Sequence, residues 1–144
     1  MIEHHKARLM AMQGLCCLDV QGDDGMDATL GFLRDGTEGL ETTDESECMI
    51  RGVLAGRDEI DELLSGQSRH WKVARMGLVE RNILRLAVWE LLTNHTPKKV
   101  VINEAVRLAK EFASAESSNF VNGVLDATAE RIAENSSPDL RRGA

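Results

Sequence analysis

FVNGVLD at residues 120–126 is the most informative stretch of the chain, particularly beside VVINEA at residues 100–105. Each segment carries an Asn and a carboxylate next to apolar residues at helical spacing. Both segments therefore predict helices whose apolar faces are interrupted by a few polar side chains.

Apolar residues recur at intervals of three and four along most of the remaining chain, as they do in amphipathic helices. The predicted helices cover about residues 4–18, 26–34, 46–64, 71–92, from Pro97 to Phe112, and from a cap at Ser117 or Ser118 to Ile132. No segment shows the two-residue alternation of a half-buried strand. The sequence predicts an all-α fold of about six to seven helices.

Glycine, proline and polar residues mark the predicted helix ends. QGDDG at residues 21–25 ends the first helix, and Ser65-Gly66 resembles a C-terminal glycine cap. Pro97 suits the opening of a helix, where its missing N–H costs nothing. Residues 35–45 are polar, acidic and glycine-bearing and predict a mobile loop, and Gly56 predicts a slip within a single helix.

The 144 residues suit one compact domain. We expect a single helical domain over residues 1–135 and a flexible tail over residues 136–144, which has little to bury. No apolar run approaches the roughly 20 residues that span a bilayer, and the N-terminus lacks the apolar core of a secretory signal. These features predict a cytoplasmic protein that does not enter membranes.

The chain offers no constellation for catalysis or metal binding. Its cysteines are an adjacent pair, Cys16 and Cys17, and a separate Cys48, so no disulfide framework or Cys-x-x-Cys pair is present, and we expect reduced thiols. The adjacent His4 and His5 point about 100° apart on a helix and cannot chelate as an i, i+4 pair does. We expect no enzyme activity, cofactor or metal.

The net charge of −7 is unlike that of most freestanding nucleic-acid binders, but it is unevenly distributed. Residues 19–62 hold 14 acids and 3 bases, whereas residues 63–144 hold 12 bases and 9 acids. One acidic and one mildly basic surface are expected.

Asn103, Asn122 and Gly123 have two interpretations, tight packing inside the domain or close approach by a ligand, and we favour internal packing.

Three ordered blocks resemble the NusB family of bacterial transcription antitermination factors. The blocks are ERNILRLAVWEL at residues 80–91, KVVINEAVRLAK at residues 99–110, and FVNGVLD, with weaker similarity in AMQGL at 11–15 and VLAG at 53–56. The resemblance covers most of the chain and implies the all-helical NusB fold.

By the same resemblance, we expect an RNA-binding protein that pairs with NusE, also a protein of the small ribosomal subunit, on boxA-type RNA of ribosomal RNA transcripts. Other Nus factors and RNA polymerase would be indirect partners. The NusB fold also occurs as the RNA-binding domain of ribosomal RNA cytosine methyltransferases. No methyltransferase sequence follows here, so the freestanding factor is the expected form.

The resemblance also assigns candidate site residues. The family opens its first helix with arginines that contact RNA phosphates, and the matching positions here are basic in type but weaker: His4, His5, Lys6 and Arg8. Phe120 has two interpretations, a core residue or, in the RNA-binding surface, a ring that stacks on a base. The resemblance also implies a partner-binding surface at four further positions: Cys16, Glu80, Arg85 and Glu116. At the first of these, Cys16 stands where the family usually has an aromatic residue.

Two alternatives to this function remain open. One is a diverged protein-interaction module without boxA specificity, whose acidic segment 19–62 binds a basic ribosomal partner. The other is an accessory domain for a separate RNA-modifying chain. An apolar surface left uncovered by a partner would also support a homodimer.

Overall fold

The computed structural model describes residues 2–36, 39–66, 73–93 and 95–135. These residues form helices and connecting turns, with no strand among them. The helices are α1 (His4–Gln21), α2 (Met26–Arg34), α3 (Leu40–Ala55), α4 (Arg57–Ser65), α5 (Leu78–Thr93), α6 (Lys98–Phe112) and α7 (Ala115–Asn135), with short 3-10 turns η1 (Asp23–Gly25) and η2 (Val73–Arg75). The predicted all-α fold of about six to seven helices is confirmed.

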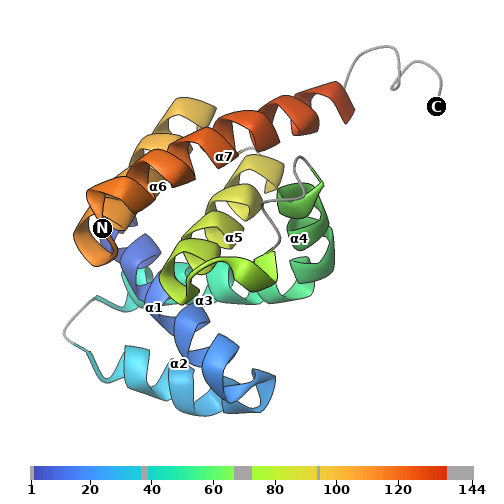
Figure 1. The fold of residues 1–144 in the computed structure, drawn as a ribbon. Coiled ribbons are helices and arrows are strands. Elements are labelled where there is room, and N and C mark those ends of the chain that lie inside the picture. The colour runs from blue at the N-terminus through green and yellow to red at the C-terminus, as the bar shows by residue number, and fades with distance from the viewer. Residues whose placement is uncertain (1, 37–38, 67–72, 94, 136–144) are drawn as a thin grey trace, which may run out of the picture.

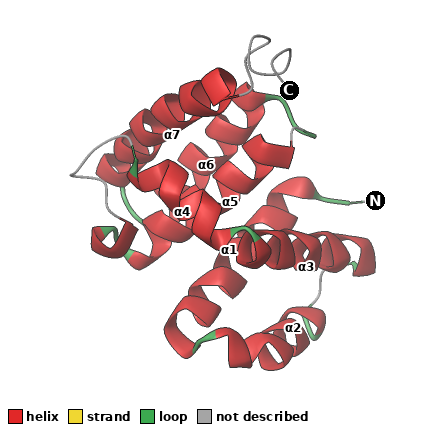
Figure 2. Ribbon diagram, turned by 90° about the vertical axis from the view of Figure 1, so that its right-hand side faces the viewer, coloured by secondary structure: helices red, strands yellow, loops and turns green. Residues whose placement is uncertain are grey.

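Helix α5 lies at the centre of the molecule. It packs against α1, α3 and α4 on one side and against α6 and α7 on the other (Figure 1). Helix α2 lies at one end of the molecule, far from the α6–α7 pair at the opposite end (Figure 2). None of the described helices is both long enough and apolar enough to cross a bilayer.

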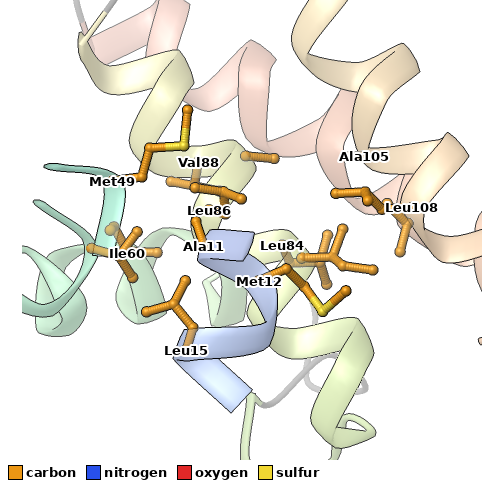
Figure 3. Close-up of a cluster of buried hydrophobic side chains, with 14 of the residues drawn as sticks. Ala11, Met12, Leu15, Met49, Ile60, Leu84, Leu86, Val88, Ala105 and Leu108 are labelled. Atoms are coloured by element: carbon orange, nitrogen blue, oxygen red, sulfur yellow. The ribbon is translucent and has the colours of Figure 1, made fainter. Parts of the chain in front are cut away.

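The core is aliphatic, as the small number of aromatic residues predicts. Side chains from α1, α3, α4, α5 and α6 converge on it (Figure 3), and the labelled ones are Ala11, Met12, Leu15, Met49, Ile60, Leu84, Leu86, Val88, Ala105 and Leu108. Within the helix predicted over residues 71–92, the apolar spacing from Ile83 to Leu92 predicts a buried face; its first part forms the buried centre of α5, whereas Leu92 is exposed. Burial of such side chains contributes about 1.5–3 kcal/mol each relative to exposure.

The predicted loop over residues 35–45 is wrong from Leu40 onward, because α3 begins there. Its first turns bury hydroxyl side chains that are satisfied locally. The Thr42 hydroxyl accepts a hydrogen bond from the Glu3 backbone N–H at 3.2 Å, and the Thr43 hydroxyl donates to the Gly39 carbonyl at 3.2 Å. Polar residues whose hydrogen bonds are satisfied can face the interior, so polarity alone misassigned the segment.

The helix predicted over residues 46–64 is two helices, since α3 ends at Ala55 and α4 begins at Arg57. Gly56 lies between them, so the predicted slip is a complete break. Gly66 follows α4 as predicted but has φ −70°, so it does not form a left-handed cap. The left-handed conformation occurs instead at Gly22, with φ +91°, where the chain leaves α1.

The C-terminal hairpin follows the predicted pattern with two corrections. Pro97 directly precedes α6 as expected, and Arg107 lies 3.5 Å from Glu111 one turn later. The four-residue spacing from Leu108 also predicts an inward-facing Phe112, but Phe112 is 41% exposed at the end of α6. The cap of α7 is Ser114, not the predicted Ser117 or Ser118, because the Ser114 hydroxyl accepts the Ser117 backbone N–H at 3.0 Å. The predicted tail, residues 136–144, lies outside the described residues.

Candidate functional site

A cavity of about 420 Å³ opens where the beginning of α5 meets the beginning of α7. Its lining combines an aromatic ring, three charged side chains and two hydroxyls: Arg75, Met76, Glu80, Ser114, Glu116, Ser117 and Phe120. The fold thus brings together Glu80, Glu116 and Phe120, three of the residues that the sequence predicts for the site. We call this cavity the α5–α7 site.

The first turn of α5 fixes Glu80. The Gly77 backbone N–H donates a hydrogen bond to Glu80 Oε1 at 3.2 Å. A carboxylate in this position satisfies one of the free N–H groups at a helix start and interacts favourably with the helix dipole. Glu80 is therefore a positioned hydrogen-bond acceptor at the rim of the cavity.

The first turn of α7 supplies the opposite wall. The Ser114 hydroxyl donates to the Ser117 hydroxyl at 3.1 Å while it accepts the Ser117 backbone N–H. Glu116 lies exposed in the same turn, and Phe120 follows one turn later, half-buried against the core. Sequence reasoning missed Ser114, Ser117 and Arg75 as lining residues; the Ser-x-x-Ser spacing before α7 was the available signal for the two serines.

The chemistry of the α5–α7 site suits a planar ligand with N–H donors. Two carboxylates, Glu80 and Glu116, stand beside the ring of Phe120, and Arg75 is the cation in the lining. Aromatic rings stack on bases, and carboxylates accept hydrogen bonds from base amino groups. Phosphate groups would meet more negative than positive charge here.

The start of α1 presents fewer free cations than its sequence suggests. His4 is exposed, and Lys6 lies 3.4 Å from Glu3 with about half of its side chain exposed. His5 is half-buried, and its Nδ1 lies 2.9 Å from Oε2 of Glu104 in α6. His4 and Lys6 are thus the predicted phosphate contacts that remain on the surface.

Arg8 points into the protein. It is 6% exposed, and its Nε and Nη2 donate to the Glu90 carboxylate at 2.9–3.1 Å. Burial alone would lower the pKa of Arg8, but the hydrogen bonds and charge of Glu90 outweigh it and raise the pKa above its usual value. The pair links α1 to α5, and direct contact of Arg8 with RNA receives no support from this geometry.

Arg85 also faces inward, in a polar network that joins α1, α4 and α5. It is 8% exposed and donates to Asp61 at 2.8 and 2.9 Å and to Asp19 at 3.3 Å. Asp19 also accepts hydrogen bonds from Arg81 at 2.6 Å and Asn82 at 3.0 Å. Burial would raise the pKa of Asp19, but these donors and nearby arginine charges lower it below its usual range.

Cys16 lies near this network on α1. Its Sγ is 3.9 Å from the Leu78 carbonyl oxygen and 3.9 Å from the sulfur of Met12. Burial raises the pKa of the Cys16 thiol to about 11, so the thiol is protonated and unreactive at neutral pH. Among the described residues, no group of three His, Cys, Asp or Glu side chains is arranged to hold a metal ion.

Comparison with known proteins agrees with the fold. The family model described as the NusB family matches residues 5–130. The transcription antitermination protein NusB of Anaeromyxobacter sp. (strain Fw109-5) is 41% identical over 143 residues, which cover 98% of this chain and 96% of that protein. NusB of Trichlorobacter lovleyi is also 41% identical, over 84% of this chain and 86% of that protein.

Two solved structures show the same arrangement of helices. T. maritima NusB superposes with a TM-score of 0.82 at 32% identity, covering 90% of this chain and 93% of that one. A chain from a crystal structure of the antitermination factors NusB and NusE in complex with dsRNA gives 0.78 at 26% identity, covering 88% and 96%. On the family match, the curated relatives and the shared fold together, this chain belongs to the NusB family.

Proposed function

We propose that this protein is an RNA-binding transcription antitermination factor that pairs with the ribosomal protein NusE on boxA-type RNA of ribosomal RNA transcripts. Other Nus factors and RNA polymerase would join through that complex, in the bacterial cytoplasm where such transcripts are made. The observation that carries the proposal is the α5–α7 site, in which an aromatic ring and fixed hydrogen-bonding groups surround a cavity of about 420 Å³.

In the proposed complex, the α5–α7 site binds bases. Phe120 stacks on a base or packs against its edge, while Glu116 and Glu80 accept hydrogen bonds from base amino groups or from NusE. The hydroxyls of Ser114 and Ser117 add short-range donors and acceptors. Single-stranded RNA exposes its bases to contacts of this kind.

Phosphate contacts have a smaller role in the proposal. His4 and Lys6 at the start of α1 contact the RNA backbone, whereas Arg8 and His5 position that helix through Glu90 and Glu104. Because only two side chains contact phosphates, RNA binding releases few counterions and its affinity depends weakly on salt. For this chain alone, the slope of the logarithm of the RNA-binding constant against the logarithm of the salt concentration should be about −2 or smaller in magnitude. NusE would then supply much of the positive charge in the complex.

The polar network around Arg85 supports the partner surface from within. Arg85 and Asp19 hold α5 against α1, and Cys16 lies on α1 beside the beginning of α5. In the proposed complex, Cys16 and Glu80 contact NusE, while Arg85 keeps the two helices in register. Arg85 is thus a positioning residue rather than a contact.

Fluorescence anisotropy with a short boxA RNA, alone and with NusE at two salt concentrations, tests the proposal. Wild type is expected to bind the RNA, more tightly with NusE than without it. Phe120→Leu retains the apolar packing but loses the ring, so affinity should fall by roughly 5- to 150-fold, which corresponds to about 1–3 kcal/mol of stacking. Phe112→Leu is the matched control, because Phe112 is exposed on α6 and does not line the cavity.

The absence of RNA binding with and without NusE would refute the proposed function. Equal loss of affinity in both Phe variants would refute the assignment of the base contact to the α5–α7 site. The internal contacts of Arg8 with Glu90 and of His5 with Glu104 favour a second candidate, a protein-interaction module without boxA specificity. That candidate predicts NusE binding with no preference for boxA over a scrambled RNA.

A further inference from the structure

An open apolar groove lies between α1 and α2. Helix α2 is at the opposite end of the molecule from the α6–α7 pair (Figures 1 and 2). The groove consists of two hollows of about 260 and 390 Å³ that share three lining residues, Gln13, Phe32 and Leu33. We call it the α1–α2 groove. It shares no lining residue with the α5–α7 site.

Phe32 stands between the two hollows and is 76% exposed, while Leu30 and Leu33 of the same helix are buried. The floor is tightly packed: a Cβ on Gly14 would lie 2.7 Å from Cδ1 of Ile50 and 3.4 Å from Cγ2 of Thr29. The groove is thus a firm apolar surface with an unburied aromatic ring at its centre. Rings of this kind, seated beside pockets, are frequent anchors of protein interfaces.

Acidic residues lie in the groove lining and next to it in the sequence: Asp35 is part of the lining, and Asp27 directly precedes the lining residue Ala28. The one lining cation, Lys6, has its Nζ 3.4 Å from Oε2 of Glu3. Asp24, Asp27 and Asp35 are exposed, and none forms an ion pair with a described residue. The three arginines of the acidic segment 19–62 are paired within it: Arg34 and Arg51 with Glu47, and Arg57 with Asp23. A ligand bearing positive charge is therefore favoured here, and RNA phosphates are disfavoured.

The size of the groove limits what it can hold. Its lining extends along α1 from Lys6 to Gln21, which corresponds to about 22 Å at about 1.5 Å per residue. A helix of about four turns has this length. A second copy of this chain would bring another acidic α2 region against the first, and like charges across an interface are costly.

We propose that the α1–α2 groove docks an amphipathic helix of a basic protein partner. The apolar side of that helix packs against Phe32 and Leu33, and its Lys or Arg residues lie near Asp24, Asp27 and Asp35. The groove shares no lining residue with the α5–α7 site, so the partner and the bases bind at the same time. It does include Lys6, so the partner competes with the RNA backbone for this one side chain.

A defined peptide tests the proposal on the full chain. The probe is a fluorescein-labelled 14-residue peptide of Leu and Lys whose leucines recur at three- and four-residue intervals. Anisotropy gives its affinity, and amide chemical shifts of the ¹⁵N-labelled protein locate it. We expect shifts on α1 and α2, and at least tenfold weaker binding by Phe32→Ser. The matched control is Leu40→Ser, because Leu40 is 73% exposed and lies outside the groove lining.

Two further arms separate the apolar and charge contributions. The double variant Asp27→Asn with Asp35→Asn should weaken binding several-fold and reduce its salt dependence. A peptide of the same composition with its leucines scrambled should bind at least tenfold more weakly. Equal affinities of Phe32→Ser and Leu40→Ser, equal binding of the scrambled peptide, or shifts confined to other helices would overturn the proposal. Because boxA binding is measured separately, failure here leaves the proposed function unaffected.

Discussion

At the scale of single residues, environment decides the role of each polar or small side chain. Gly123 lies in the middle of α7, and we expected it to allow tight packing within the domain. That interpretation is wrong, because Gly123 is exposed and, apart from the adjacent residues and backbone of α7, no described atom lies within 4 Å of where its Cβ would be. Internal packing is also the favoured interpretation for Asn103 and Asn122, and it is wrong for them too, because both are exposed. Gly52 shows the opposite case, since a Cβ there would lie 2.2 Å from Nε1 of Trp89.

These two glycines predict opposite effects of substitution by alanine. Gly123→Ala should raise the free energy of unfolding by about 0.5–1 kcal/mol, because it removes a helix-interior glycine without a clash. Gly52→Ala should lower it by about 1–3 kcal/mol, because the added methyl group displaces the Trp89 ring. Urea titrations followed by circular dichroism measure both, and destabilisation by Gly123→Ala would show that its surface is covered after all.

At the scale of secondary-structure elements, periodicity located most of the helices, while their ends depended on local hydrogen bonds. The sequence predicts α2 at residues 26–34, and the structure has it at Met26–Arg34. The start of α3 and the cap of α7 were misplaced, because hydroxyls of Thr42, Thr43 and Ser114 form short-range bonds that apolar spacing does not report. These bonds also shape the α5–α7 site, since Ser114 lies both at the start of α7 and in the cavity lining.

Removal of the α7 cap has a measurable cost. Ser114→Ala should lower the free energy of unfolding by about 1 kcal/mol, because the Ser117 backbone N–H loses its acceptor. Ser117→Ala should cost less, since it retains that N–H and the Ser114 hydroxyl that accepts from it. Thermal or urea unfolding of the two variants under identical conditions makes the comparison. Equal costs would mean that the hydroxyl–hydroxyl bond, and not the cap, is the stabilising contact.

At the scale of the whole molecule, buried and partly buried ion pairs join helix α1 to helices α4 and α5. Arg8–Glu90 connects α1 to α5, and Asp19 with Arg85 and Asp61 connects α1, α5 and α4. A buried charge left without its partner is strongly destabilising. Arg8 and Arg85, which the family resemblance assigns to binding, are therefore structural contacts here.

The Asp19 network predicts a specific dependence of stability on pH. The folded-state pKa of Asp19 lies below its usual value near 3.9. Its contribution is thus fully present above about pH 4 and is lost as pH falls through the lower folded-state pKa. Asp19→Asn should cost about 1.5–3 kcal/mol at pH 7, and its stability should fall less steeply than that of wild type below pH 4.

Urea unfolding at several pH values between 3 and 7 tests this expectation. Asp24→Asn is the control, because Asp24 is exposed and forms no ion pair with a described residue. Parallel pH profiles of wild type and Asp19→Asn would show that other carboxylates account for the acid sensitivity.

The sequence by itself determined the fold class, the apolar faces of most helices, the family, and three residues of the α5–α7 site. Those features follow from local periodicity and from motifs that are contiguous in the chain. Only the tertiary structure decided that Arg8, Arg85 and His5 are engaged in contacts inside the protein, that Gly123 is exposed, and that Phe32 stands in an open groove. The physical reason is that the partner of a charged or aromatic side chain lies on another helix, often many residues away, and its identity depends on packing that no local pattern encodes.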